Sequence, residues 1–186
     1  MLIVSLTSML LATAPMMVPA DEDNPRLKLI ERNVFDVSLE PELRKISVND
    51  LTGIDTEAAQ SILVRAIQSA EESVALSTLE AIAEMNDPPR DVIEPIVERW
   101  LRNGDSTLAT PLLSALTRYG SDSVSMLEVA CNVERPLEQR RRAVQALSAF
   151  AGGEGASVLI ALANSEDHED IRLEVFDGLR SLWSRL

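Results

Sequence analysis

The sequence predicts an all-α protein, and three observations support that fold class. Alanine, leucine, glutamate, arginine, serine and valine dominate the composition, while aromatic residues make up only 3%. Most of these residues lose little freedom in a helical turn, whereas sheet proteins usually show more aromatic and β-branched runs. Glycine is sparse, with seven residues. Finally, large apolar residues recur at helical spacing in segments that repeat along the chain.

Length and charge limit the classes of partner. The 186 residues, 46% of them apolar, suffice for one domain with one core. The formal net charge is −13 and the pI is about 4.5. A surface this acidic repels phosphate groups, so we expect neither nucleic acid nor an anionic membrane surface as a partner.

The amino terminus predicts export. Residues 2–20 are uncharged and mostly apolar, and they end in Val18-Pro19-Ala20 before the acidic Asp21-Glu22-Asp23. This pattern is typical of a cleaved signal peptide at residues 1–20, although its positively charged start is missing. We therefore expect a periplasmic or secreted protein without stable membrane insertion. Two alternatives stay open: a membrane anchor formed by residues 2–20, and a cytoplasmic chain whose amino terminus packs on the domain.

The first element after this segment is a short helix within residues 21–38. Asn24-Pro25 would cap it, and Leu27, Ile30 and Val34 would form its apolar side. The stretch from Val34 to Leu39 could equally be extended. Residues 39–186 then form the repeat domain.

Five similar segments define that repeat. They span residues 43–54, 74–85, 108–119, 139–150 and 171–182, and they align on Leu51, Ile82, Leu116, Leu147 and Leu179 at spacings of 31, 34, 31 and 32 residues. Apolar columns stand eight residues before, three before and three after these anchors, so Leu43 and Phe176 are predicted core residues. Small residues precede four anchors, namely Ala81, Ala115, Ala146 and Gly178. Offsets of three with small residues between them indicate one face of a helix that a neighbour approaches closely.

Each repeat has room for a second helix. Four such helices are predicted before the aligned ones, at Glu57–Ala70, Arg90–Arg102, Asp122–Asn132 and Glu154–Asn164. Pro95 and Pro111 fall inside predicted helices and indicate kinks or late starts. At the end of the last helix, Trp183 is expected to cover the open end of the stack.

The chain resembles the HEAT-like (armadillo-type) helical repeat families. The residues that carry the resemblance are Glu40-Pro41-x-Leu43-Arg44-x-x-x-Val48-x-x-Leu51 and His168-x-x-Ile171-Arg172-x-x-Val175-Phe176-x-Gly178-Leu179. The aliphatic-Arg pair recurs partly at Arg140 and is lost at Ala75 and Ala109. The resemblance implies a right-handed α-solenoid of about five antiparallel helix pairs, in which the second helices line a concave, partner-binding side.

From the resemblance we expect partner-contacting residues on the second helices, away from the core columns. The candidates are Ser77, Glu80, Ser114, Arg142, Gln145, Glu174 and Asp177. The solvated-face interpretation stays open for each of them.

The chemistry-bearing residues predict no active site, metal site or cofactor. Cys131 lies in an apolar run and is expected to be a buried hydrophobe. His168 lies among carboxylates that serve helix capping better than metal binding. The three arginines at 140–142 point to different sides of a helix, so they are expected to pair with neighbouring carboxylates. Nucleotide-binding, zinc-protease and serine-hydrolase motifs are absent from the sequence.

The leading hypothesis is therefore a non-catalytic, exported adaptor or scaffold that binds another protein. One alternative is a HEAT-like accessory enzyme, or a pigment lyase or chaperone acting on a small ligand. A third is a structural repeat domain that self-associates within a larger assembly. The partner's identity and the oligomeric state stay open.

Overall fold

The computed structural model describes residues 24–54, 56–104, 106–150, 153–165 and 169–184. These residues form ten α-helices and a short 3-10 segment, with no strand, which confirms the all-α fold class. The predicted signal segment lies outside the described residues. Within the described ranges, no helix combines the length and apolarity needed to cross a bilayer.

The helices are α1 (Pro25–Phe35), α2 (Pro41–Thr52), α3 (Glu57–Ile67), α4 (Glu72–Glu84), α5 (Ile93–Asn103), α6 (Ala109–Arg118), α7 (Ser121–Ala130), α8 (Leu137–Leu147), α9 (Glu154–Ser165) and α10 (Glu169–Trp183), with the 3-10 segment at Arg90–Val92 before α5.

Helix positions agree with the repeat. The five aligned segments become the even-numbered helices, and the four predicted partners become α3, α5, α7 and α9. The first helix forms as expected, because the Asn24 side chain accepts hydrogen bonds from the backbone N–H groups of Arg26 (3.0 Å) and Leu27 (3.4 Å). Helix α1 ends at Phe35, so Val34 is helical and the backbone becomes extended only at Asp36.

The two internal prolines mark late helix starts. Pro95 is the third residue of α5 and Pro111 the third residue of α6. In the first turn a backbone N–H has no carbonyl partner within the helix, so a proline there removes no hydrogen bond.

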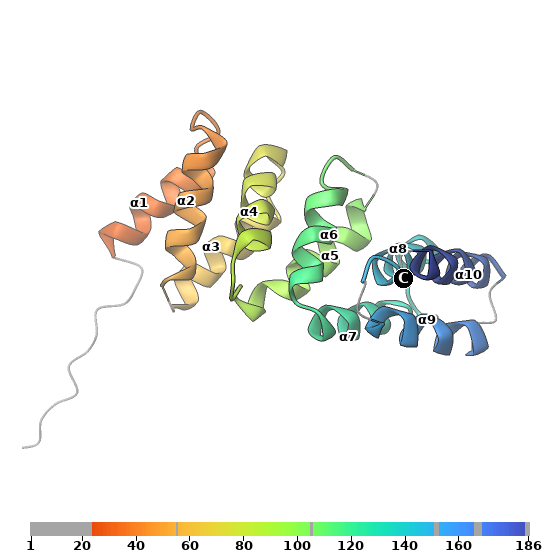
Figure 1. Ribbon diagram of the computed structural model, residues 1–186. Helices are drawn as coiled ribbons and strands as arrows, with labels where there is room; N and C mark the ends of the chain where they lie inside the picture. Colours follow the sequence, from red (N-terminus) through yellow and green to blue (C-terminus); the bar gives the residue numbers. More distant parts are fainter. Residues whose placement is uncertain (1–23, 55, 105, 151–152, 166–168, 185–186) are drawn as a thin grey trace, which may run out of the picture.

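The helix pairs form a long row from α1 at one end to α10 at the other (Figure 1). Along most of this row, even-numbered helices pack against even-numbered ones and odd-numbered helices against odd-numbered ones. Helix α4 packs between α2 and α6, and α8 packs against α10; on the other side, α3 lies between α1 and α5, and α7 against α9. The pattern changes between the third and fourth pairs, where α8 packs on α5. At that junction the row turns, so α8 and α10 run nearly across the direction of α2 and α4 (Figure 1).

The anchor column forms the centre of the core. Leu51, Ile82, Leu116 and Leu147 are buried, and Leu179 is half-buried. A second column, four residues before the anchors, is buried in all five even-numbered helices: Ser47, Thr78, Leu112, Ala143 and Val175. Two of its members are polar and are therefore missing from the predicted core.

Helical geometry allows these polar residues to be buried. The Thr78 hydroxyl donates to the Val74 carbonyl (2.8 Å), and the Ser47 hydroxyl donates to the Leu43 carbonyl (3.1 Å). Each hydroxyl thus finds an acceptor one turn back in its own helix.

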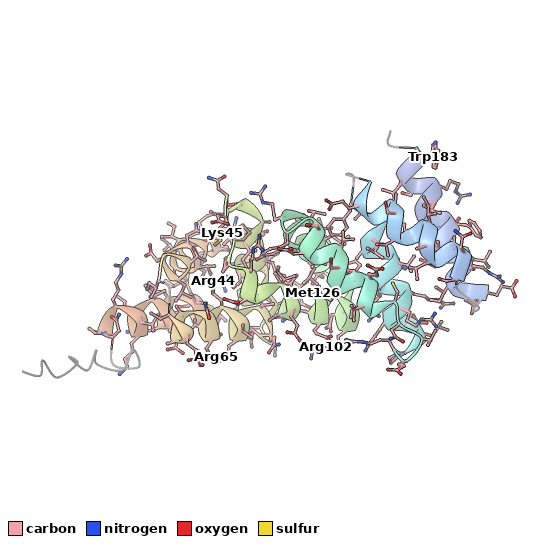
Figure 2. The ribbon with its side chains drawn as sticks, turned by 90° about the horizontal axis from the view of Figure 1, so that it is seen from below. Arg44, Lys45, Arg65, Arg102, Met126 and Trp183 are labelled. Carbon is pink, nitrogen blue, oxygen red and sulfur yellow. The ribbon has the colours of Figure 1, made fainter. Side chains whose placement is uncertain are left out.

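Three predicted core or capping positions are wrong, and all lie at the ends of the row. Leu43 of α2 is 50% exposed and Phe176 of α10 is 55% exposed. Trp183 is 74% exposed and extends away from α10, so it does not cover the end of the stack (Figure 2). At these ends no neighbouring pair among the described residues covers the helix face.

Two of the three arginines in the recurring aliphatic-Arg pair are buried structural donors, whereas Arg172 is exposed. Arg44 Nη1 donates to the Ser73 hydroxyl at 3.0 Å, and Arg140 Nε donates to the Cys131 carbonyl at 3.2 Å. Arg141, the next residue, forms the expected ion pair with a carboxylate of a neighbouring repeat: its guanidinium lies 3.3 Å from Asp170 of α10. The basic run therefore joins α8 to its neighbours.

Candidate protein-interaction site

Two of the seven predicted partner-contacting residues serve the fold. Ser77 is buried in α4, where its hydroxyl donates to the Ser73 carbonyl at 3.0 Å. Arg142 is half-buried, and its guanidinium donates to the carbonyls of Leu101 (2.9 Å) and Arg102 (2.5 Å) at the end of α5. Ser77 is therefore inaccessible to a partner. The Arg142 side chain caps the end of the neighbouring helix α5.

The other five residues lie at least partly exposed on the even-numbered helices: Glu80, Ser114, Gln145, Glu174 and Asp177. Gln145 Nε2 and Glu174 Oε1 meet at 2.9 Å and join α8 to α10. Asp177 pairs with Arg180 of its own helix at 2.8 Å. The face predicted to bind a partner is therefore largely a set of polar contacts between helices.

Lys45 forms the densest of these contacts. Its ammonium lies 3.1 Å from Glu80 and 3.3 Å from both Glu42 and Glu84, so it links α2 to α4. Hydrogen bonding to Glu80 and the other two carboxylates raises the pKa of Lys45, against a smaller opposing effect of burial. Figure 2 shows Lys45 beside the buried Arg44 on the same helix.

A different surface, between α5 and α7, has the features of a binding groove. Helix α6 ends at a tight turn in which Gly120 has φ +49°, and the chain reverses directly into α7. This brings α7 against α5. Side chains of both helices and of the segment after α7 surround a cavity of about 370 Å³, lined by Glu94, Val97, Glu98, Ser125, Met126, Val129, Ala130 and Arg135. We call this the α5–α7 groove.

The floor of the α5–α7 groove is apolar and its walls are exposed. Val97 and Ala130 are buried and form part of the core, so the floor is fixed by packing. Met126 is 37% exposed and Val129 is 67% exposed. Met126 lies near the middle of the molecule, far from both ends (Figure 2). Exposed apolar side chains around a concave surface are typical of a site that contacts another molecule.

The rim of the α5–α7 groove carries charge. Glu94 is exposed on α5, and Glu98 one turn later is half-buried. Arg135 Nη2 lies 3.0 Å from Glu98 Oε1, and Arg135 Nη1 donates to Gln139 Oε1 at 3.4 Å. Arg135 thus holds one end of the groove by joining α5 to the start of α8, while Glu94 leaves a negative charge on the other part of the rim.

Sequence reasoning missed this groove, although α7 contains a signal for it. Leu127 and Ala130 face the core, whereas Met126, Val129 and the following Val133 are exposed at spacings of three and four. Helix α7 is therefore apolar on two sides. A second apolar stripe on a surface helix is unusual, since one stripe normally suffices to bury it.

The residues considered for chemistry have structural roles or lie outside the described part. Cys131 is buried at the end of α7, as expected. His168 lies outside the described residues. Across the part of the chain that the structure describes, histidine, cysteine and carboxylate side chains do not gather in a group of three or more able to hold a metal ion.

Comparison with known proteins finds likeness only among solved structures. No known protein family matches this chain, and no curated protein does. Two similar structures are crystal structures of engineered proteins from the Northeast Structural Genomics Consortium. One has 20% sequence identity and a TM-score of 0.38, covering 86% of this chain and 79% of that one. The other has 19% identity and a TM-score of 0.38, covering 84% of this chain and 47% of that one. This chain therefore spans about half the length of the second protein.

Proposed function

We propose that this chain is a non-catalytic adaptor of HEAT-like repeats that binds another protein through the α5–α7 groove. The observation that carries the proposal is the combination of a fixed apolar floor at Val97 and Ala130 with exposed walls at Met126 and Val129. Methionine suits such a surface because its flexible, polarizable side chain adapts to different apolar partners.

The chemistry of the groove favours a basic amphipathic helix as the bound segment. Apolar side chains at spacings of three and four on such a helix would enter the groove between α5 and α7. Lysine or arginine on its flanks would meet Glu94 at the rim, and the net charge of −13 would attract it from a distance. An acidic segment of the same shape would be repelled.

Two synthetic helical peptides test this proposal. Both carry leucine at one helical face; one has lysine and the other glutamate at all remaining positions. Fluorescence anisotropy should show saturable binding of the basic peptide to the full chain and weak or no binding of the acidic one. Met126→Glu and Val129→Glu should each reduce the affinity for the basic peptide by about tenfold or more, because they place a carboxylate on the apolar wall.

Ile160→Glu on α9 is the matched control, since Ile160 is also an exposed aliphatic residue but lies outside the groove. This variant should bind the basic peptide like the unmodified chain. If all three variants bind equally, attraction by the overall charge explains the binding and the groove proposal is wrong. If the two groove variants do lose affinity, crosslinking from position 129 in the native host would identify the natural partner.

We further propose that the helix pairs form a right-handed solenoid and that the protein acts in the periplasm or is secreted. The packing of α4 between α2 and α6, and of α8 on α10, supports the solenoid. Residues 2–20 support export. Sequencing the amino terminus of protein from the native host tests export: a start near Asp21 is expected, and an uncleaved chain in the cytoplasm would contradict it.

A further inference from the structure

One end of the row exposes apolar residues of α2 that the repeat buries elsewhere. Leu43 is half exposed, although the equivalent residues of later repeats are buried, namely Val74, Leu108 and Ile171. Ile46, one turn along, is also exposed. We call Leu43 and Ile46 the α2 end face.

This face points away from the next pair. Arg44 bonds to Ser73 of α4, and Lys45 pairs with Glu80 of α4. With 3.6 residues per turn, Leu43 and Ile46 lie on the opposite side of α2 from these contacts. In α4, α6 and α10, that side of the helix packs on the preceding even-numbered helix.

The other end of the row, at α10, also exposes apolar residues. Phe176 of α10 is exposed, although the equivalent residues Val48, Leu79 and Val144 are buried. Leu173 and Trp183 are exposed on the same side of the helix. We call Leu173, Phe176 and Trp183 the α10 end face.

The α10 end face also points away from the rest of the chain. Asp170 and Glu174 contact Arg141 and Gln145 of α8. A Cβ added at Gly178 would lie 3.2 Å from Ser148 Cβ, so this position also faces α8. Leu173, Phe176 and Trp183 lie on the far side of α10, where an internal even-numbered helix receives the next pair.

We propose that copies of this chain associate head to tail, with the α10 end face of one copy packing on the α2 end face of another. The contact would repeat between molecules the packing that α2 and α4, or α8 and α10, make within one molecule. Both faces are apolar, and Trp183 lies at the opposite end of the molecule from Arg44 (Figure 2).

Charge favours the head-to-tail contact over contact between like ends. Exposed Arg172 lies beside the α10 end face, where Arg180 is paired with Asp177 of its own helix. Exposed Asp50 lies beside the α2 end face, where Glu42 is paired with Lys45. Joining two α2 faces would bring two Asp50 carboxylates together, whereas a head-to-tail contact brings Asp50 toward Arg172. A head-to-tail contact pairs opposite charges and is heterologous, so it forms rings or open chains of copies.

Two charge-introducing variants of the full chain test the geometry. Ile46→Asp disables only the α2 end face, and Phe176→Asp disables only the α10 end face; both sites are exposed, so folding should survive. Sedimentation velocity should show the average mass of the unmodified chain rising with concentration. Each single variant should weaken this association by about tenfold or more, because the contact would bury an unpaired carboxylate. An equimolar mixture should form a complex of two copies and stop there, since each variant retains one intact face.

Three outcomes would overturn the proposal. The first is an unmodified chain that stays monomeric at every concentration. The second is an Ile46→Asp chain that still associates like the unmodified one, which indicates a symmetric contact. The third is a mixture that remains monomeric although circular dichroism shows both variants folded. Val129→Glu in the α5–α7 groove should leave self-association unchanged, so failure of this proposal and of the binding groove are distinguishable.

Discussion

The guanidinium of Arg99, on α5, donates a hydrogen bond to the backbone carbonyl of Ser69 at a distance of 2.9 Å. It also donates to the carbonyl of Ile67, the last residue of α3. Carbonyls at a helix end have no partner within their own helix, and they carry the negative end of its dipole. Arg99 is buried, so a neighbouring pair caps α3 from within the core.

Replacing Arg99 by methionine should therefore destabilise the protein. The change keeps an aliphatic side chain but leaves two carbonyls without their charged donor, which should lower the free energy of unfolding by about 2 kcal/mol. Urea denaturation followed by circular dichroism measures the effect. Arg102→Met is the control, because the Arg102 side chain is exposed and donates to the Glu98 carbonyl of its own helix. Equal stabilities for the two variants would show that the capping contact contributes nothing.

Gly155, near the start of α9, is predicted to tolerate no side chain. A Cβ there would overlap the Leu147 carbonyl oxygen and lie 3.3 Å from Phe150 Cβ, so α9 would have to move away from α8. Gly155→Ala should lower the free energy of unfolding by about 1–3 kcal/mol. The melting temperature, followed by circular dichroism, measures this change.

Gly53→Ala provides the matched control for Gly155. Gly53 has helical backbone angles, and the closest atom to an added Cβ is the Asp50 carbonyl oxygen at 3.6 Å, an ordinary contact. Alanine should be neutral there, or stabilising by about 0.4–1 kcal/mol, because it restricts the unfolded chain. A Gly155→Ala chain as stable as Gly53→Ala would contradict the close approach of α8 and α9.

The order and bounds of the helices were predictable from local sequence. Leu51, Leu116 and Leu147 recur at a constant offset from other apolar residues, and helical periodicity is a property of one segment at a time. Caps such as Asn24 are equally local. The fold class and the positions of the paired helices therefore followed from the sequence.

Contacts between segments were not predictable in the same way. Ser47 can be buried because its hydroxyl donates to a carbonyl of its own helix. Its polarity in the sequence predicts an exposed residue instead. Arg142 points into a helix end instead of toward a partner because α8 packs on α5. The α5–α7 groove also depends on contacts between helices. Its signal in the sequence is the second apolar side of α7, which carries Met126 and Val129.

Lys45 should give part of the stability a dependence on alkaline pH. Glu80, Glu42 and Glu84 raise its pKa in the folded protein above the ordinary value of 10.5. A raised folded pKa means that the ammonium stabilises the fold fully below that ordinary value, and that the contribution falls as the pH rises through the folded pKa. The difference in urea midpoint between the unmodified chain and Lys45→Met should be constant from pH 7 to about 10 and shrink above it.

A control separates this titration from general alkaline unfolding. Lys45→Arg keeps a positive charge that does not titrate in this range, so the difference in urea midpoint between Lys45→Arg and Lys45→Met should not shrink at high pH. If the Lys45→Met difference stays constant to the highest pH at which the chain folds, the lysine–carboxylate cluster does not contribute to stability.

Trp100 and Arg142 hold the junction at which the row of helices turns. Trp100 Nε1 donates to the Arg142 backbone carbonyl at 2.6 Å, while the Arg142 side chain donates to Leu101 at the end of α5. Trp100→Phe and Arg142→Met should each cost about 1 kcal/mol of unfolding free energy. Each variant removes a different hydrogen bond of the junction, since Arg142→Met keeps the backbone carbonyl that Trp100 binds. Hydrogen exchange should accelerate mainly in α8 and α10 in both variants, because these bonds tie the two helices to the first three pairs. Unchanged exchange in those helices would show that the junction is held elsewhere.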